Sequence, residues 1–369
     1  MEDNFMQYFG QLEDSRVQGR VLHPMKNIVL ITVVAAFCGL DDWEEIAAFA
    51  EYRKDFFAKY LDLSNGIPSH DTIARFFQHL NPKSFQKVFA EWAHFLVKGC
   101  EGKTVSIDGK RIRTASSMND DHPLHIVSAW VSENQAVLGQ VKVADKSNEI
   151  TAIPMLLDIL DIEGSVVTID AMGTQTGIAE KIVEKRADYV LSVKENQPTL
   201  KDDLVRTFEA KLPLVRYEEE DLGHGRIEHR RYRFTDNLSR IYAPEKWKGL
   251  AGMVRVERTS TEKKTGEESS DVRYFITSTN DAEKAFHSIR KHWGVESMHW
   301  QLDVLLNEDG SLKRAGNSAE NFNIIRKMVV NLMRNDAYPF KKKKKKSLKL
   351  KMLAATFDEE YLEHLIFSL

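Results

Sequence analysis

Between residues 104 and 209 the chain alternates strands and helices in an order that few folds accommodate. The segment begins with three β-branched and apolar runs joined by short polar turns: TVSID at 104–108, HIVSAWV at 125–131 and AVLGQVKV at 136–143. Their period of two predicts an antiparallel meander. Two further strands, SVVTID at 165–170 and DYVLSVK at 188–194, then alternate with three predicted helices. The predicted order is therefore β-β-β-α-β-α-β-α.

This order matches a ribonuclease H-like core, so we expect an α/β fold with a mixed sheet flanked by helices. In such a core the first and fourth strands lie side by side at the sheet centre. In this chain the two strands end on acids, Asp108 and Asp170, which would become neighbours. An aspartate after a strand is more often a turn former or a helix cap, so each acid alone is a weak signal. We expect the small residues Ala171 and Gly173 to leave room beside Asp170 for a metal and a phosphate group.

The remaining segments predict a domain on each side of this core and one inside it. Residues 1–100 show helical spacing of apolar residues, and a helix that begins after Ser69 fits a helix-turn-helix arrangement, so we expect an N-terminal DNA-binding domain. A plain helical bundle fits equally well. Residues 101–335 are the predicted catalytic domain, with a β-rich insertion at about 212–280. Residues 336–369 are a predicted basic C-terminal tail, whose lysine run at 341–346 we expect to be solvated and disordered.

Composition narrows the functional class only a little. The formal net charge of −3 neither predicts nor excludes a polyanionic partner, because phosphate affinity depends on local basic surface. The two cysteines, Cys38 and Cys100, form no paired motif, which argues against a disulfide scaffold and fits a reducing cytoplasm. The longest apolar run, at 28–40, is shorter than the roughly 20 residues of a membrane span, so we expect no membrane association.

A third acid completes a predicted metal site. Glu296 lies on a helix after the insertion, with His299 and Asp303 on the same helical face. Carboxylate oxygens are the ligands that Mg²⁺ and Mn²⁺ prefer. Two such ions, roughly 3.5–4 Å apart, support phosphoryl transfer by activating the attacking oxygen and stabilising the leaving one. We therefore predict a site for two Mg²⁺ or Mn²⁺ ions at Asp108, Asp170 and Glu296.

Longer motifs carry a resemblance to a known family. TVSIDGKRIR, the stretch at 146–175, DYVLSVKENQPTL, GHGRIEHR and HWGVESMHWQLDV closely resemble the H-repeat-associated insertion-sequence transposases, a branch of the DDE superfamily. The similarity spans most of the chain as far as Asp309. It implies a ribonuclease H-like catalytic domain, an acidic triad at Asp108, Asp170 and Glu296, and DNA strand transfer with Mg²⁺.

From this resemblance we expect a transposase that binds the terminal inverted repeats of its own element. It would pair them in a synaptic complex, as a homodimer or a higher assembly, and cut and join DNA through a 3′-hydroxyl. We expect it in the cytoplasm, at the nucleoid.

The chain departs from this pattern around Glu296. Transposases with a similar insertion often carry Tyr, Arg and Lys at places that hold Ile289, His292 and Asp303 in this chain. The phosphate-contacting role of the Arg and Lys would then be absent or would move, for instance to Arg290 and Lys291. A hairpin-forming pathway therefore cannot be carried over.

Basic residues near the three acids and in the insertion are candidates for DNA contact. The predicted DNA-binding residues are Lys110, Arg111, Arg113, Lys194, Arg226, Arg230, Arg290, Lys291 and His299. Trp293 and Trp300 flank Glu296, and we expect both to pack in the core, although either could stack on a displaced base.

Two other classes of protein fit part of the sequence. The Glu-x-x-His pairs Glu91–His94 and Glu296–His299 would suit a di-iron carboxylate site, but such a site needs a four-helix bundle and the middle of the chain is rich in strands. A catalytically inactive remnant that binds DNA as a regulator is the second alternative. The presence of all three acids favours an intact active site.

Overall fold

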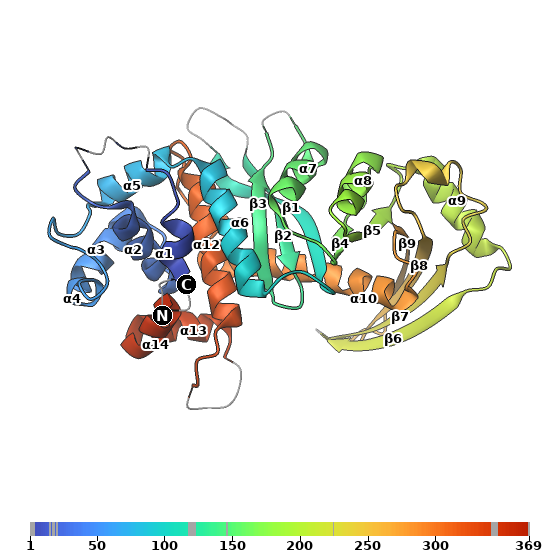
Figure 1. Ribbon diagram of the computed structural model, residues 1–369. Helices are drawn as coiled ribbons and strands as arrows, with labels where there is room; N and C mark the ends of the chain where they lie inside the picture. Colours follow the sequence, from blue (N-terminus) through green and yellow to red (C-terminus); the bar gives the residue numbers. More distant parts are fainter. Residues whose placement is uncertain are drawn as a thin grey trace. The chain divides into compact units, whose positions relative to one another are not determined.

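The chain forms two compact units, each built from segments that are distant in the sequence. The computed structural model describes residues 4–14, 16, 19, 21–116, 123–144, 147–223, 225–340 and 346–367 (Figure 1). The first unit comprises Met1–Lys98, Gly109–Ser147 and Glu296–Leu369, and the second comprises Gly99–Asp108 and Asn148–Val295. The fold is mixed α/β, and strand β1 (Thr104–Ser116) contributes to both units.

The N-terminal part of the first unit is helical. Its helices are α1 (Asn4–Phe9), α2 (Met25–Phe37), α3 (Trp43–Tyr52), α4 (Lys54–Phe57), α5 (His70–His79) and α6 (Pro82–Val97). Every residue of α2 from Asn27 to Phe37 is buried, as expected for a helix that is apolar on all sides. The side chain of Ser69 accepts a hydrogen bond from the Thr72 N–H, so the predicted N-cap of α5 is confirmed.

The same unit contains an antiparallel strand pair covered by a long helix. Strands β2 (Pro123–Val131) and β3 (Ala136–Lys142) pair antiparallel, and α12 (Ser318–Asn335) packs against β3, α2, α5 and α6. The buried side chain of Asn331 accepts a hydrogen bond from the Val137 N–H (2.7 Å) and donates one to its carbonyl (2.8 Å). Within the described ranges, no helix combines the length and the apolar character that a membrane span requires.

Parallel strands and their crossover helices form the first part of the second unit. The first residues of β1 pair in parallel with β4 (Val166–Ile169), which pairs in parallel with β5 (Asp188–Val193). The crossover helices are α7 (Glu149–Ile159) and α8 (Thr176–Glu184), and α9 (Pro198–Glu209) follows β5. Because parallel neighbours bring their carboxyl ends to the same edge, the residues after β1's paired segment and after β4 lie close together.

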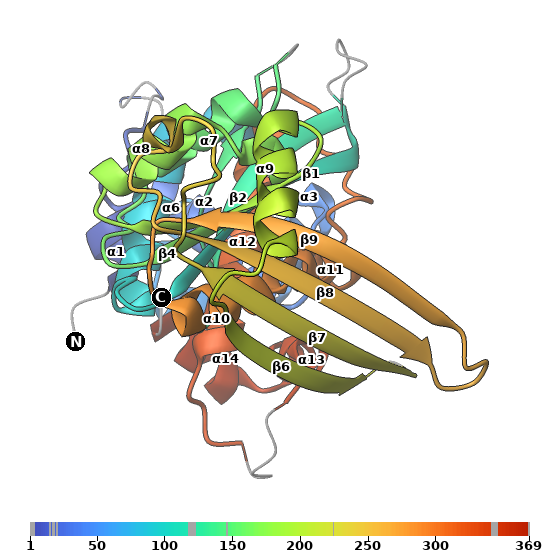
Figure 2. The same ribbon diagram turned by 90° about the vertical axis from the view of Figure 1, so that its right-hand side faces the viewer.

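Two long hairpins extend the sheet of the second unit. Strands β6 (Val215–Gly223), β7 (Arg226–Thr235), β8 (Gly252–Glu262) and β9 (Glu268–Thr277) occupy the predicted β-rich segment, and Figure 2 shows them side by side. The strand order is β5-β9-β8-β7-β6, which leaves β6 at an edge. Helix α10 (Ala282–His292) covers one face of this sheet, where Phe286 packs in a core with Tyr232, Phe234 and Val254.

Two details differ from the sequence-based expectations. The segment after the insertion was expected to form one helix, but it forms two. Helix α10 ends at its C-cap Trp293, and α11 (Gly294–Leu306) follows. The expected tail contains two helices that the sequence pattern did not predict, α13 (Leu348–Phe357) and α14 (Glu359–Phe367). Residues 341–345 of the lysine run lie outside the described residues.

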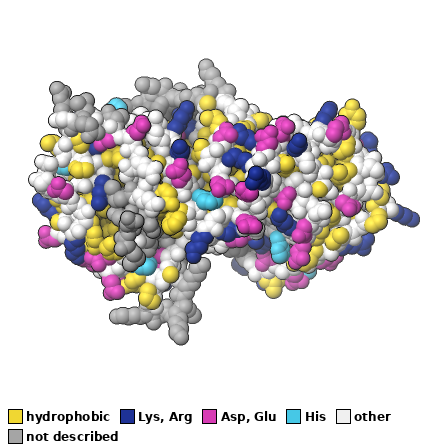
Figure 3. Space-filling model, in the orientation of Figure 1, with side chains coloured by type: hydrophobic (Ala, Val, Ile, Leu, Met, Phe, Trp, Pro, Cys, Tyr) yellow, Lys and Arg dark blue, Asp and Glu magenta, His cyan; other side chains and the backbone are white. Residues whose placement is uncertain are grey.

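On the face drawn in Figure 3, basic and acidic side chains are interspersed, in keeping with a net charge near zero.

Candidate active site

The ends of two paired strands bring two aspartates together. Ile107 of β1 is the register partner of Ile169 of β4, and Asp108 and Asp170 are the next residues on the two parallel strands. Both side chains are half-buried. Their carboxylates therefore start from adjacent backbone positions at the same edge of the sheet.

Asp170 also ends its strand in a specific way. Its Oδ1 atom accepts hydrogen bonds from the N–H groups of Met172 (3.1 Å) and Gly173 (3.4 Å), which begin a short 3₁₀ helix. Burial, and then the nearby Glu149 carboxylate, raise the pKa of Asp170, while these two hydrogen bonds and Lys194 act in the opposite direction. Since both hydrogen bonds use one oxygen, the capping role is compatible with a second role as a metal ligand.

The small residues after Asp170 serve packing rather than access. A Cβ at Gly173 would lie 2.3 Å from Cγ2 of Ile169 and 2.9 Å from Cδ1 of Ile153, and Ala171 is buried. The expectation that Gly173 leaves room for metal and phosphate is therefore wrong. It is small because helix α7 and strand β4 pack directly against it.

Glu296 belongs to the first unit, in the first turn of α11, and its side chain is exposed. Trp300, one helical turn further on, is 60% exposed, so the expectation that it packs in the core is wrong. Trp293 is half-buried and contacts arginine side chains of the second unit. The structure thus brings Asp108 and Asp170 together, and a role for Glu296 beside them remains a prediction.

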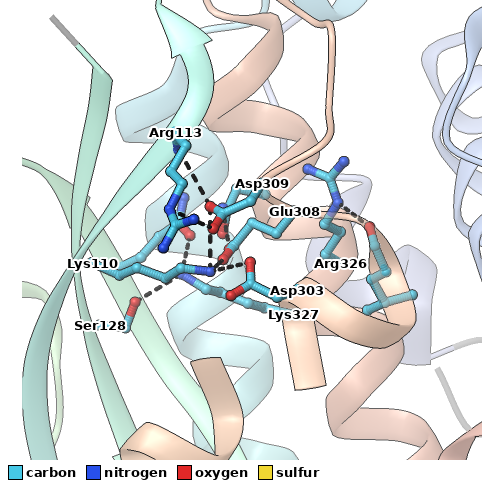
Figure 4. A network of polar contacts seen from close by, with 11 residues as sticks. Lys110, Arg113, Ser128, Asp303, Glu308, Asp309, Arg326 and Lys327 are labelled. Carbon is cyan, nitrogen blue, oxygen red and sulfur yellow. Dashed lines mark hydrogen bonds and ion pairs between the residues drawn. The ribbon is translucent and has the colours of Figure 1, made fainter. Parts of the chain in front are cut away.

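A second group of acids lies in the first unit, around Lys110 of β1 (Figure 4). The Lys110 ammonium donates hydrogen bonds to Asp303 and to Glu308 (2.6 Å) and lies 3.6 Å from Asp309. Glu308 is buried and also accepts a hydrogen bond from Asn323 (2.6 Å). Burial disfavours the charge of Lys110, but Glu308 and Asp303 outweigh it, so the pKa of Lys110 is raised. For Glu308, Lys327 and Lys110 outweigh the effect of burial and lower its pKa.

This second group has the composition of a metal site but already holds a cation. One carboxylate oxygen from each of Asp303, Glu308 and Asp309 lies within 4.8 Å of the others, the one such group found among the described residues. The Lys110 ammonium supplies the positive charge that these acids need, so we interpret the group as a buried ion-pair network. Neither Glu-x-x-His pair that would suit di-iron belongs to this group.

The predicted DNA-binding residues differ in how accessible they are. Arg111, Arg113, Lys194 and Arg226 are exposed. Arg230 is buried and forms an ion pair with Glu228, and Arg290 donates to Asp221 (2.6 Å). Burial lowers the pKa of His299 to about 4, so its ring is neutral at neutral pH. Lys291 is half-buried. A DNA contact by Lys110, or by the Nη2 atoms of Arg230 and Arg290, would require these pairs to open.

Comparison with protein families identifies two matching segments. The family model described as Transposase DDE domain matches residues 100–332. A second model, described as DDE_Tnp_1-associated, matches residues 6–93. The two segments together contain Asp108, Asp170 and Glu296 and most of the N-terminal helices.

Individual relatives agree with this result. "Putative transposase YncI" of Escherichia coli O157:H7 is 40% identical over 346 residues, which cover 90% of this chain and 87% of the relative. "H repeat-associated putative transposase YhhI" of Escherichia coli strain K12 is 38% identical over 371 residues, covering 97% and 96%. "Inactive transposase YbfQ" of the same strain is 41% identical over 70 residues, 19% of this chain and 83% of the relative.

Proposed function

Because the chain belongs to the transposase DDE domain family, we propose that it is the transposase of an insertion-sequence-like element with a catalytic triad of Asp108, Asp170 and Glu296. The observation that carries this proposal is the register of β1 and β4, in which Ile107 pairs with Ile169 immediately before the two aspartates. Glu296 enters by its position in the motif HWGVESMHWQLDV. The core of residues 101–335 would then be ribonuclease H-like.

The donor atoms of the two aspartates fit a hard divalent cation. Both are carboxylates, and no nitrogen or sulfur ligand is part of the triad, a composition typical of Mg²⁺ or Mn²⁺ sites. When bound, such ions supply Lewis-acid stabilisation of the oxygens that attack and leave phosphorus. The carboxylates of Asp108 and Asp170 would hold and partly neutralise such ions, with Asp170 oriented by the hydrogen bonds that it accepts from Met172 and Gly173.

The remaining parts would bind and arrange the DNA. We assign residues 1–100 to recognition of the terminal inverted repeats and the tail at 336–369 to nonspecific DNA affinity. Contacts with the DNA backbone are assigned to the insertion at about 212–280 and to the exposed side chains of Arg111, Arg113, Lys194 and Arg226. The protein would act in the cytoplasm at the nucleoid. A homodimer that pairs two element ends would cleave them and join the freed 3′-hydroxyls to target DNA.

The triad is tested by end cleavage with single substitutions. The substrate is a duplex that carries the inverted repeat found beside the reading frame, incubated with protein and Mg²⁺. Asp108→Ala, Asp170→Ala and Glu296→Ala should each reduce cleavage by at least about 100-fold with DNA binding retained. Glu163→Ala is the matched control, since this carboxylate is 62% exposed and pairs with Arg186 on the surface. Normal cleavage by any triad variant removes that residue from the site.

A second candidate is an inactive DNA-binding remnant that acts as a regulator. It is favoured by the similarity of 70 residues to a relative named as an inactive transposase. The same assay separates the two: a wild-type protein that binds the duplex but leaves it uncut with Mg²⁺ and with Mn²⁺ supports the remnant.

A further inference from the structure

Three arginines of the second unit converge on one tryptophan. The guanidinium carbons of Arg230, Arg258 and Arg273 lie 5.2, 5.5 and 5.1 Å from the ring centre of Trp293. The arginines come from three strands, β7, β8 and β9, and Trp293 comes from the end of α10. Each contact is a cation–π interaction, and together they surround one side chain with three positive charges.

The strand register explains how these charges are brought together. Arg230 is the direct cross-strand partner of Arg258, and Val256 is the partner of Arg273. Like charges directly opposite each other in a sheet destabilise it. Arg230 and Arg258 share the Glu228 carboxylate, and Arg273 pairs with Asp271 at 2.8 Å. Arg230 also lies 3.6 Å from Glu219 and 4.0 Å from Asp221. Glu219 and Asp221 are also the partners of Arg290, so these two carboxylates are shared between two arginines.

Several donors of the trio are buried without a hydrogen bond. In the part of the chain that the structure describes, Nε and Nη1 of Arg230 and Nε of Arg258 find no acceptor, although Arg230 Nη1 lies 3.6 Å from Glu219. The Arg230 side chain is only 4% exposed. Buried donors are rarely left unpaired, because the lost hydration costs free energy. These donors are therefore available to an acceptor from outside the chain.

A cavity joins the trio to the proposed catalytic aspartate. Its volume is about 90 Å³, several times what one water molecule needs, and its wall includes Asp170, Lys194, Trp293 and the three arginines. Of the charged residues in the wall, five are cations, since Arg290 also contributes, and two are acids, Asp170 and Asp271. The carboxylates that reduce this excess, Glu219, Asp221 and Glu228, are not part of the wall.

The chemistry of the cavity favours an anion over a nucleobase. The guanidinium groups already contact the Trp293 ring, so a base could stack there only by displacing them. His292 adds no charge: burial lowers its pKa to about 4, and its Nδ1 is 2.9 Å from Oγ1 of Thr168. The positive charge of this cavity is therefore supplied by Lys194, by Arg290 and by the arginines of the β-hairpins.

We propose that the arginine trio binds a phosphodiester group of the DNA strand, next to the one held at Asp170. This inference rests on the proposed function and deepens it. From the sequence alone, this phosphate contact was expected to be either absent or moved, for instance to Arg290 and Lys291. The proposal gives it to Arg230, Arg258 and Arg273. Arginine suits this role because its planar fork of donors matches phosphate oxygens.

The test measures how DNA affinity depends on salt. The full-length protein is titrated with the inverted-repeat duplex in EDTA, so that binding is measured without cleavage. The slope of log K against log salt should fall by about 0.9 for each phosphate that Arg258→Gln, Arg273→Gln or the double variant no longer binds. The matched control is Arg255→Gln, which should leave the slope unchanged. Arg255 lies on the opposite face of β8, and its side chain is 21% exposed, against 26% for Arg258.

Two further measurements separate this proposal from a structural role and from the proposed function. Arg258→Lys and Arg273→Lys keep the charge and should restore most of the slope, whereas a merely structural defect would not be restored. Melting curves show whether Arg258→Gln and Arg273→Gln are folded. Unchanged slopes in the folded variants overturn the proposed phosphate site but leave the proposed function intact. Full cleavage by Asp170→Ala overturns the proposed function while leaving the salt slopes as evidence for an anion site.

Discussion

The acidic residues of this protein form two groups, and they have different roles in each. Asp170 orients itself by capping a short helix, which leaves its second oxygen for another ligand. Asp303, Glu308 and Asp309 instead surround the Lys110 ammonium. Both groups consist of carboxylates, so composition alone does not distinguish a metal site from an ion-pair network. The presence of a protein cation, here the Lys110 ammonium, identifies the second group as an ion-pair network.

Lys110→Met should destabilise the first unit strongly. The variant removes the cation while Glu308, whose side chain is 2% exposed, remains buried, a situation that typically costs about 3–5 kcal/mol. Urea unfolding at neutral pH measures the decrease. Arg113→Met is the control, because the Arg113 side chain is 85% exposed, lies 3.7 Å from Asp309 and should cost less than about 1 kcal/mol. Equal effects of the two variants would contradict the network.

The same variant should have a characteristic pH dependence. The pKa of Glu308 is lowered in the folded protein, so its pairing stabilises above the unfolded pKa of about 4.3 and is lost as pH falls through the folded value. The pKa of Lys110 is raised, so its contribution persists up to about pH 10.4. The stability difference between wild type and Lys110→Met should thus be largest between these limits and narrow in acid.

At the residue scale, sequence reasoning found the two aspartates but missed the network. Asp108 and Asp170 each follow a strand, and strand ends can be recognised from local patterns. Lys110 and Asp303 are 193 residues apart, and no local pattern links them. The arginine trio was missed for the same reason: only Arg230 was predicted, and the meeting of three strands at Trp293 depends on register.

Among the elements, strand β6 shows how the sheet edge is protected. Four consecutive acids, Glu218 to Asp221, lie on this edge strand, and Glu218 and Glu220 are 71% and 51% exposed. Charges on an edge strand disfavour pairing with another molecule. In the register of the hairpin they face Arg231 and His229.

Removing the edge charges should promote association without unfolding the protein. In Glu218→Thr/Glu220→Thr the strand propensity is kept and only exposed ion pairs are removed, so stability should change by less than about 1 kcal/mol. Light scattering over time should show faster growth of large species. Glu163→Thr/Glu245→Thr changes the net charge equally outside the strands and should scatter like the wild type. Equal growth in both variants would refute the role of the edge.

Most elements were predictable because their patterns are local. The strands and helices between 104 and 209 and the strands of the insertion follow from alternation and helical spacing. The break between α10 and α11 was missed, because the spacing of apolar residues continues across Trp293 and Gly294. Helices α13 and α14 were missed because the lysine run before them suggested a disordered tail, although Tyr361, Leu362 and Leu365 are buried.

At the scale of the whole molecule, the first unit depends on segments from both ends of the chain. Helix α12 packs against α2, α5, α6 and β3, and its residues from Phe322 to Met333 are all buried. The N-terminal helices therefore lack a large part of their core without it, even though residues 1–100 form one block in the sequence.

A fragment of residues 1–98 should accordingly fail to fold by itself. Exposure of the surfaces that α12 covers removes apolar burial on which small domains depend. Circular dichroism should show reduced helicity and no cooperative melting, and adding a peptide of residues 314–337 should increase the helical signal. A cooperative transition of the isolated fragment would contradict this account and establish an autonomous N-terminal domain.

The most direct test of the proposed active site is the position of a bound metal. Crystals of the protein with an inverted-repeat duplex, grown with Mn²⁺, allow the ions to be located by their anomalous scattering. We predict peaks liganded by Asp108, Asp170 and Glu296. Peaks at Asp303, Glu308 and Asp309, or ions away from Asp170, would contradict the proposal and assign the metal site to the second acidic group.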